Sequence, residues 1–214
     1  MLPVSDENPT RRFPVVTLLL VAANVVVFFL WQAQVGMQRS VAWGGLVPAE
    51  LRPVSLLGVQ HLFTSMFMHG GLLHLLGNMW FLWIFGDNVE DEIGRFRFVM
   101  FYLLSGIAAA AAYVAFNSQS KLPMVGASGA ISGVLGAYLV LHPRARVKML
   151  MFIRFVSMPA WCYLLVWIVL QVLAQSQASE TSGPRVAYLA HIGGFLAGVI
   201  LSVLVVPRQN PVDF

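Results

Sequence analysis

The chain has 214 residues, of which 58% are hydrophobic and 10% are charged, and its formal net charge at pH 7 is +4. A soluble domain has about 25% charged residues, so this composition excludes an ordinary soluble fold and indicates a membrane protein. The basic residues are spread along the chain and form no patch, so nothing indicates nucleic-acid binding. The single cysteine, Cys162, excludes an intramolecular disulfide.

Six apolar segments have about the length that a helix needs to cross a bilayer. We expect spans at residues 14–32, 71–86, 96–116, 126–142, 155–175 and 186–206. The first segment is too long for the core of a signal peptide, so we expect it to be retained. The prediction is an all-α membrane protein with a six-helix bundle at 14–206, between short tails at 1–13 and 207–214.

The connections between the expected spans differ in kind. Residues 33–70 are semi-apolar, and Pro48 and Pro53 prevent one continuous helix, so we expect a loop that lies in or on the membrane interface. The other connections are short and polar. The second and fourth spans are short and contain glycine, which is typical of helices that are surrounded by protein rather than by lipid.

Lysine and arginine are distributed unevenly between the two sets of connections. One set holds nine of them: Arg11, Arg12, Arg95, Arg97, Arg144, Arg146, Lys148, Arg154 and Arg208. The other set holds four: Arg39, Arg52, Lys121 and Arg185. Because the side richer in these residues usually faces the cytoplasm, both termini are predicted to be cytoplasmic. The second, fourth and sixth spans then begin on the outer side.

Three polar side chains lie near the outer ends of those three spans. They are His74 in the second span, Ser128 in the fourth and His191 in the sixth. Each lies within about two helical turns of its entry point, so we expect the three to share a depth. A serine is a poor nucleophile unless a base accepts its proton, so Ser128 and His191 are candidates for a nucleophile and its general base.

Small residues recur at every fourth position on two of the spans. They are Gly129, Gly133 and Ala137 in the fourth span, and Ala190, Gly194 and Gly198 in the sixth. Such stripes let two membrane helices approach closely. We therefore expect the fourth and sixth spans to bring Ser128 and His191 within hydrogen-bond distance of each other.

Acyl transfer also needs donors for the negative charge that develops on the carbonyl oxygen. His74 and Asn78 are four residues apart and share one helix face, and both can donate hydrogen bonds. The backbone N–H of Ser128, at the start of a helix, is a third candidate. All nine acidic residues fall outside the expected spans, so we expect a dyad without a carboxylate.

Other hydrolytic chemistries fit the sequence less well. The zinc-protease motif is H-E-x-x-H, whereas His69 and His74 are five residues apart with no glutamate between them. An aspartyl protease would need two carboxylates within the spans. The nucleophile-elbow motif G-x-S-x-G fails because residue 130 is alanine. The sequence indicates no metal site and no cofactor.

Three motifs together resemble those of the rhomboid intramembrane serine proteases. They are HGGLLHLLGNMWFLWIFGDNVED at 69–91, GASGAISG at 126–133 and AHIGGFLAG at 190–198. The resemblance extends over about residues 55–206. It implies a six-helix bundle with cytoplasmic termini that cleaves single-pass membrane proteins near the outer end of their transmembrane helix. The compact layout is typical of a bacterial inner-membrane protein.

The resemblance also implies a role for individual residues. Ser128 is the implied nucleophile and His191 the implied general base. His74, Asn78 and the Ser128 backbone N–H are the implied oxyanion donors. The supporting residues that it implies are Gly126 in the serine motif, His69, which helps support the loop and a water-accessible cavity, and Glu90, which anchors helix ends.

The chain departs from the family pattern in two places. Gln60 and His61 stand where members often have Trp-Arg in the long first loop. Ser132 stands four residues after Ser128, where some members have an aromatic residue that packs on the histidine. The resemblance therefore leaves open what holds the His191 ring.

Two functions of other classes stay open at this point. One is an inactive rhomboid-like protein that binds membrane helices without cutting them, which a serine-directed probe would not label. The other is a transporter or channel, for which inverted repeats or paired broken helices would be expected. The sequence shows neither of those features.

Overall fold

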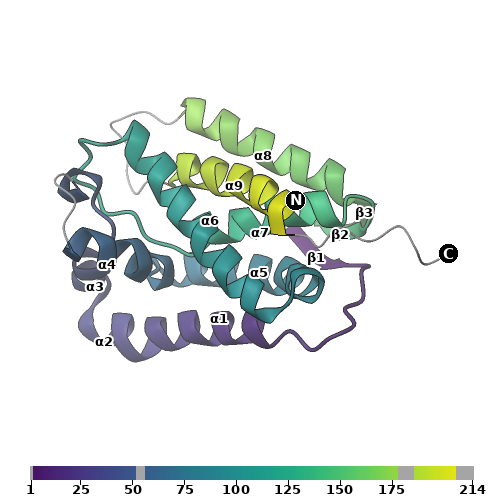
Figure 1. Ribbon diagram of the computed structural model, residues 1–214, viewed down its shortest axis with the longest axis horizontal. Helices are drawn as coiled ribbons and strands as arrows, with labels where there is room; N and C mark the ends of the chain where they lie inside the picture. Colours follow the sequence, from purple (N-terminus) through teal and green to yellow (C-terminus); the bar gives the residue numbers. More distant parts are fainter. Residues whose placement is uncertain (1, 52–55, 178–185, 206–214) are drawn as a thin grey trace.

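The computed structural model describes residues 2–51, 56–177 and 186–205 of the chain. A central helix, α7 (Ser128–Leu141), packs against four others. These are α5 (Leu72–Ile93), α6 (Arg95–Phe116), α8 (Ala160–Gln177) and α9 (Tyr188–Val205). Helix α1 (Val15–Val26) lies along one side of the bundle and α8 along the opposite side (Figure 1).

Each expected span corresponds to a helix, although the ends differ. Helix α1 continues through a π-helical turn at Val27–Gln32 and α2 (Ala33–Val35). Three helical segments of the described chain are long and apolar enough to span a bilayer: Val15–Val35, Arg95–Phe116 and Ala160–Gln177. Shorter apolar helices accompany them, including α7. The chain is therefore a multi-pass integral membrane protein with a helical bundle.

The fourth span is enclosed by protein, as its glycines indicated. Every residue of α7 from Gly129 to Tyr138 is buried. A helix that is apolar all round belongs in a core. Since its neighbours rather than lipid surround it, α7 needs only 14 residues.

The second span is longer than expected. We predicted its end at residue 86, but α5 continues for two more turns to Ile93. Asp87 and Glu90 made this stretch look like a loop, yet they lie on a regular helix. The helix ends at Gly94, whose φ of +83° is readily adopted only by glycine.

The prediction of a purely α-helical protein is wrong at one end of the bundle. Three short strands form an antiparallel sheet in the order β1-β2-β3. They are β1 (Leu2–Asp6), β2 (Arg146–Met151) and β3 (Arg154–Pro159). The fifth helix therefore begins at Ala160 and not at residue 155, and the expected tail at 1–13 contains a strand.

The connection expected to be a loop at 33–70 is mostly helical where it is described. It contains α3 (Met37–Gly44), a 3-10 turn at Pro48–Leu51, α4 (Leu56–Thr64) and a second 3-10 turn at Ser65–Phe67. On α4, Gln60 is exposed and His61 is buried. Pro53 and the tail expected at 207–214 lie outside the described residues.

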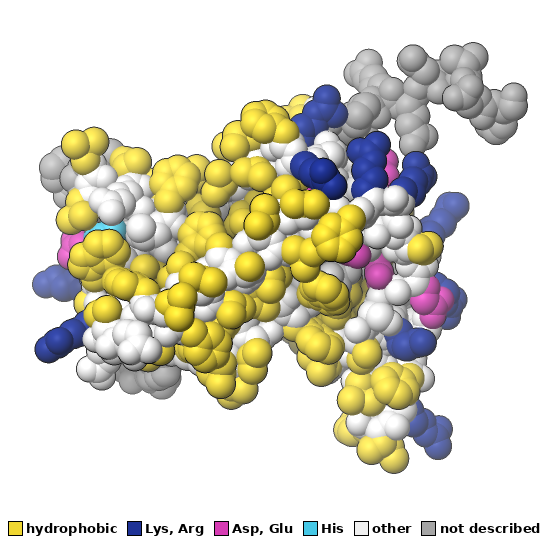
Figure 2. All heavy atoms as spheres, turned by 90° about the horizontal axis from the view of Figure 1, so that it is seen from below, with side chains coloured by type: hydrophobic (Ala, Val, Ile, Leu, Met, Phe, Trp, Pro, Cys, Tyr) yellow, Lys and Arg dark blue, Asp and Glu magenta, His cyan; other side chains and the backbone are white. Residues whose placement is uncertain are grey.

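Apolar and basic side chains are segregated on the molecular surface. Figure 2 shows hydrophobic side chains over the middle of one face, with most Lys and Arg side chains gathered at one end. Because the horizontal axis is shared with Figure 1, this is the end that carries the strands. An apolar middle between polar ends suits a lipid-facing surface.

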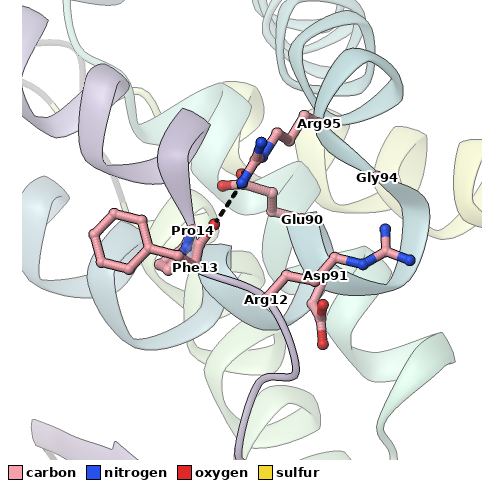
Figure 3. Close-up of a pocket in the computed structure, with 7 residues that line it drawn as sticks. All are labelled: Arg12, Phe13, Pro14, Glu90, Asp91, Gly94 and Arg95. Atoms are coloured by element: carbon pink, nitrogen blue, oxygen red, sulfur yellow. Dashed lines mark hydrogen bonds and ion pairs between the residues drawn. The ribbon is translucent and has the colours of Figure 1, made fainter.

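Glu90 joins the end of α5 to the start of α1. Its carboxylate accepts hydrogen bonds from the backbone N–H groups of Val16 at 3.0 Å and Thr17 at 2.8 Å, and from the Thr17 hydroxyl at 2.9 Å. These two N–H groups have no partner within α1 itself. Figure 3 shows the small pocket beside Glu90, where the Arg95 guanidinium donates to the Phe13 carbonyl oxygen at 3.4 Å.

Asp6 joins strand β1 to the far end of the central helix. Its carboxylate accepts hydrogen bonds from the Tyr138 hydroxyl and from Asn88 Nδ2. Burial raises the pKa of the Asp6 carboxyl from 3.8 to about 6, and the nearby Asp87 acts in the same direction. The folded protein therefore holds this proton more tightly than the unfolded chain does.

We expect the stability of the fold to depend on pH through Asp6. A folded-state pKa above the unfolded value means that the contribution of Asp6 is fully present below about pH 3.8 and is lost as the pH rises through about 6. Thermal unfolding in detergent between pH 4 and pH 7 should show this loss, and Asp6→Asn should reduce it. Glu7→Gln is the control, since Glu7 is exposed. Equal pH slopes for wild type and Asp6→Asn would contradict the prediction.

Candidate active site

A cavity of about 950 Å³ opens among the helices at the end where α5, α7 and α9 begin. We call it the site cavity. Its lining includes four of the residues that the sequence singled out: His74, Asn78, Ser128 and His191. Gly126 also lines it, whereas His69 does not. The helices thus bring together side chains that are up to 117 residues apart in the sequence.

Ser128 and His191 contact each other directly. Ser128 is the first residue of α7, and His191 lies in the first turn of α9. The distance between Ser128 Oγ and His191 Nε2 is 2.8 Å, which is a hydrogen bond. A hydroxyl that donates to an imidazole nitrogen can lose its proton to that nitrogen as the oxygen attacks.

The contact depends on the absence of side chains between α7 and α9. A Cβ atom added to Gly194 would lie 2.0 Å from the Gly129 carbonyl oxygen, and one on Gly198 would lie 2.0 Å from the Gly133 carbonyl oxygen. The two backbones therefore touch along the predicted stripes. Gly136, outside the every-fourth pattern, also faces α9, because its added Cβ would lie 2.2 Å from the Phe195 carbonyl oxygen.

The His74 ring presents an N–H group toward the site cavity. The backbone N–H of Gly70 donates to His74 Nδ1 at 3.3 Å. A neutral imidazole with an accepting Nδ1 carries its hydrogen on Nε2. A Cβ on Gly126 would lie 2.9 Å from His74 Nε2 and 3.5 Å from Ser128 Oγ. His74 Nε2 and Ser128 Oγ are therefore both close to the space beside Gly126. Gly126 also has φ +127°, where a larger residue would be strained.

Asn78 lies one helical turn beyond His74 and is 7% exposed. Within the described part of the chain its Nδ2 amide group has no hydrogen-bond partner. An unpaired buried donor costs free energy, about 1–3 kcal/mol, unless a partner arrives. Since Asn78 lines the site cavity, an oxygen atom of a bound molecule would supply that partner.

His69 lies behind His74. Its ring is fully buried and meets the His74 ring edge-on, with centroids 5.2 Å apart. Gln32 fixes its backbone: the His69 N–H donates to Gln32 Oε1 at 2.9 Å, and Gln32 Nε2 donates to the His69 carbonyl oxygen at 3.1 Å. His69 is therefore placed to support the His74 ring rather than to contact a ligand.

The His191 ring is held by side chains of α8, a contact that the sequence did not predict. Gln171 Oε1 lies 2.8 Å from His191 Nδ1, and the Trp167 ring lies 6.1 Å from the His191 ring between centroids. Ser132 makes no such contact; its hydroxyl donates to the Ser128 carbonyl oxygen at 2.6 Å. The sequence feature that could have indicated this contact is Trp167 followed four residues later by Gln171, on one face of an apolar span.

Among the residues that the structure describes, the lining of the site cavity includes no aspartate or glutamate. All nine acidic residues were expected to lie outside the spans; four of them, Asp87, Glu90, Asp91 and Glu92, do lie beyond residue 86, but on the last two turns of α5 rather than in a loop. Glu90 lies 16 residues beyond His74 on that helix, about 24 Å away at the usual rise. These carboxylates are therefore remote from Ser128.

Comparison with known proteins gives one consistent result. Residues 57–208 match the Rhomboid domain. The chain is 32% identical over 149 residues to RHOMBOID-like protein 5 of Arabidopsis thaliana, covering 70% of this chain and 45% of that protein. It is 31% identical over 192 residues to Rhomboid protein 1, mitochondrial, of Saccharomyces cerevisiae, covering 85% of this chain and 50% of that protein.

A bacterial relative matches over a shorter stretch. The chain is 34% identical over 126 residues to Rhomboid protease GluP of Bacillus subtilis, covering 59% of this chain and 24% of that protein. The matches to the three relatives thus span half or less of the relatives' own length.

Proposed function

The chain belongs to the rhomboid family, and from this premise we propose that it is a serine-type intramembrane endopeptidase with a Ser128–His191 dyad. The observation that carries the proposal is the 2.8 Å contact between Ser128 Oγ and His191 Nε2 inside a cavity of a membrane bundle. A serine paired with a base is the arrangement that makes a hydroxyl nucleophilic.

In the first step, Ser128 Oγ attacks the carbonyl carbon of a peptide bond while His191 Nε2 takes its proton. The C–O bond forms and the carbonyl oxygen becomes an oxyanion. His74 Nε2–H, Asn78 Nδ2–H and the Ser128 backbone N–H are the proposed donors to that oxygen. Each such donor is worth roughly 2.7–4 kcal/mol of transition-state stabilisation.

The intermediate then collapses. The C–N bond breaks, His191 gives its proton to the leaving amine, and an ester links the substrate to Ser128. A water molecule next loses a proton to His191 and attacks the ester carbon. The C–O bond to Ser128 breaks, the serine regains its proton from His191, and the acid product leaves.

The proposed substrates are single-pass membrane proteins that are cut near the outer end of their helix. Ser128 and His191 both lie at the start of their helices, and strand β2 follows the opposite end of α7. Most Lys and Arg side chains gather at the end that carries the strands (Figure 2). If the basic end faces the cytoplasm, the dyad lies close to the outer surface, where water can reach it. A substrate helix must unwind there, since its peptide bonds are engaged in hydrogen bonds.

The same proposal includes the membrane arrangement. Six helices, α1 and α5 to α9, cross the bilayer, with both termini in the cytoplasm and the protein in a bacterial inner membrane. The surrounding helices let the short α7 stay within the bundle without lipid contact.

The proposed function is tested with purified protein in liposomes that contain a single-span reporter. We expect two fragments, and mass spectrometry should place the new N-terminus in the outer part of the reporter helix. A fluorophosphonate probe should label Ser128. A rhomboid-like binding protein would retain the reporter uncut and stay unlabelled, and that result would overturn the proposal.

A further inference from the structure

We propose that Gln171 is a positioning residue that holds His191 in the tautomer able to accept the Ser128 proton. The inference rests on the proposed function, because it assigns a task within the same site. It adds a third member, an amide from α8, to the pair that the sequence predicted.

The two ring nitrogens of His191 are engaged by different helices. His191 Nε2 lies 2.8 Å from Ser128 Oγ on α7, and His191 Nδ1 lies 2.8 Å from Gln171 Oε1 on α8. A neutral imidazole carries one N–H group. To accept the serine proton, Nε2 must be free of hydrogen, so Nδ1 must carry it and donate. Gln171 then accepts through its carbonyl oxygen.

The plane of the His191 ring is set by aromatic side chains of α8 and α9. Trp167 lies one turn before Gln171 on α8, and its ring is inclined by 32° to the His191 ring at a centroid distance of 6.1 Å. Trp167 also packs on Phe195 at 6.0 Å, and the Tyr188 ring meets His191 edge-on at 6.2 Å. Rotation of the imidazole away from Ser128 would therefore break the Gln171 hydrogen bond and displace packed rings.

While His191 is neutral, an amide at position 171 is less costly to bury in the site cavity than a carboxylate would be. The described lining of the site cavity holds no aspartate or glutamate and no lysine or arginine. A lone carboxylate there would be a buried charge without a partner, which is costly. A glutamine accepts the Nδ1 hydrogen without that cost, although it gives the imidazolium less stabilisation than a charge would.

The inference is tested with Gln171→Leu, Gln171→Met and Gln171→Glu, using Gln175→Leu, one turn further along α8, as the control. We expect Gln171→Leu and Gln171→Met to lower kcat by about tenfold, the effect of one lost hydrogen bond, with little change in KM. Gln171→Glu should restore most of kcat and move the acid limb of the pH–rate profile to higher pH, because a carboxylate favours the imidazolium. Gln175→Leu should match wild type.

A second measurement reports on the tautomer without any catalysis. Nitrogen-15 chemical shifts of His191, assigned by their loss in His191→Asn, should show the hydrogen on Nδ1 in wild type and a mixture of tautomers in Gln171→Leu. Unchanged shifts and unchanged kcat in Gln171→Leu would overturn the inference while the dyad stands. A wild type that cuts no reporter would instead count against the proposed function, and the shifts would still decide the role of Gln171.

Discussion

Replacing Ser128 with alanine is expected to lower the rate of reporter cleavage by about 10⁶-fold, the scale seen when a serine hydrolase loses its nucleophile. In the proposed mechanism, the substitution removes the atom that forms the acyl-enzyme. The donors around the oxyanion stay in place, so the residual rate should be that of direct attack by water. The Ser128 hydroxyl is part of the surface of an existing cavity, so we expect little change in the unfolding temperature.

The proposed dyad also predicts how the single and double variants compare in the same assay. His191→Ala should cost about as much as Ser128→Ala, and the double variant should be no slower than either, because the two residues act as one unit. Ser105→Ala is the matched control, since Ser105 is a buried serine on α6 outside the site cavity. Cleavage that survives in Ser128→Ala, or that is lost in Ser105→Ala, would contradict the assignment of the nucleophile.

The pairing of α7 with α9 could be predicted because its signal is local to each helix. Small residues at every fourth position, such as Gly129 with Gly133 and Gly194 with Gly198, mark a face that admits another backbone. Since α7 and α9 each carry such a face, the two helices are expected to pack against each other. The polar residues at the start of both helices then meet, and the structure shows that contact between Ser128 and His191.

Gln171 could not be assigned in the same way. Its helix is mostly exposed to the surroundings of the bundle and carries no stripe of small residues to indicate its neighbour. The sequence shows an amide in an apolar segment, and such a group needs a partner, but any of several helices could supply one. The identity of that partner depends on the rotation of α8 about its axis, which only the packed structure reveals.

The sheet was missed for a different reason. Strand β2 does alternate, with Val147 and Met149 buried and Arg146 and Lys148 exposed, but six residues are few for a periodic signal. Strand β3 is mostly apolar and runs directly into α8, so the hydropathy pattern merges the two. Strand β1 pairs with β2 across more than 140 residues of sequence, a separation that no local pattern reports.

The second large effect is expected where Gly198 of α9 meets Gly133 of α7. A Cβ atom on Gly198 would lie 2.0 Å from the Gly133 carbonyl oxygen and 2.6 Å from Gly133 Cα. Both atoms belong to a backbone that is buried on all sides, so they cannot move aside as a flexible side chain would. We therefore expect Gly198→Ala to destabilise the fold by about 3 kcal/mol, at the upper end of the usual cost of overpacking.

The same substitution should also lower activity, although Gly198 lies two helical turns, about 10 Å, beyond His191. Separation of α7 from α9 lengthens the distance between Ser128 Oγ and His191 Nε2, so labelling by a fluorophosphonate probe should slow in parallel with the fall in unfolding temperature. Gly77→Ala on α5 is the stability control, because a Cβ there has no heavy atom within 4 Å and alanine favours a helix. A Gly198→Ala protein as stable as wild type would show that the two backbones do not touch at this point, and the close approach that places the serine against its base would then need another cause.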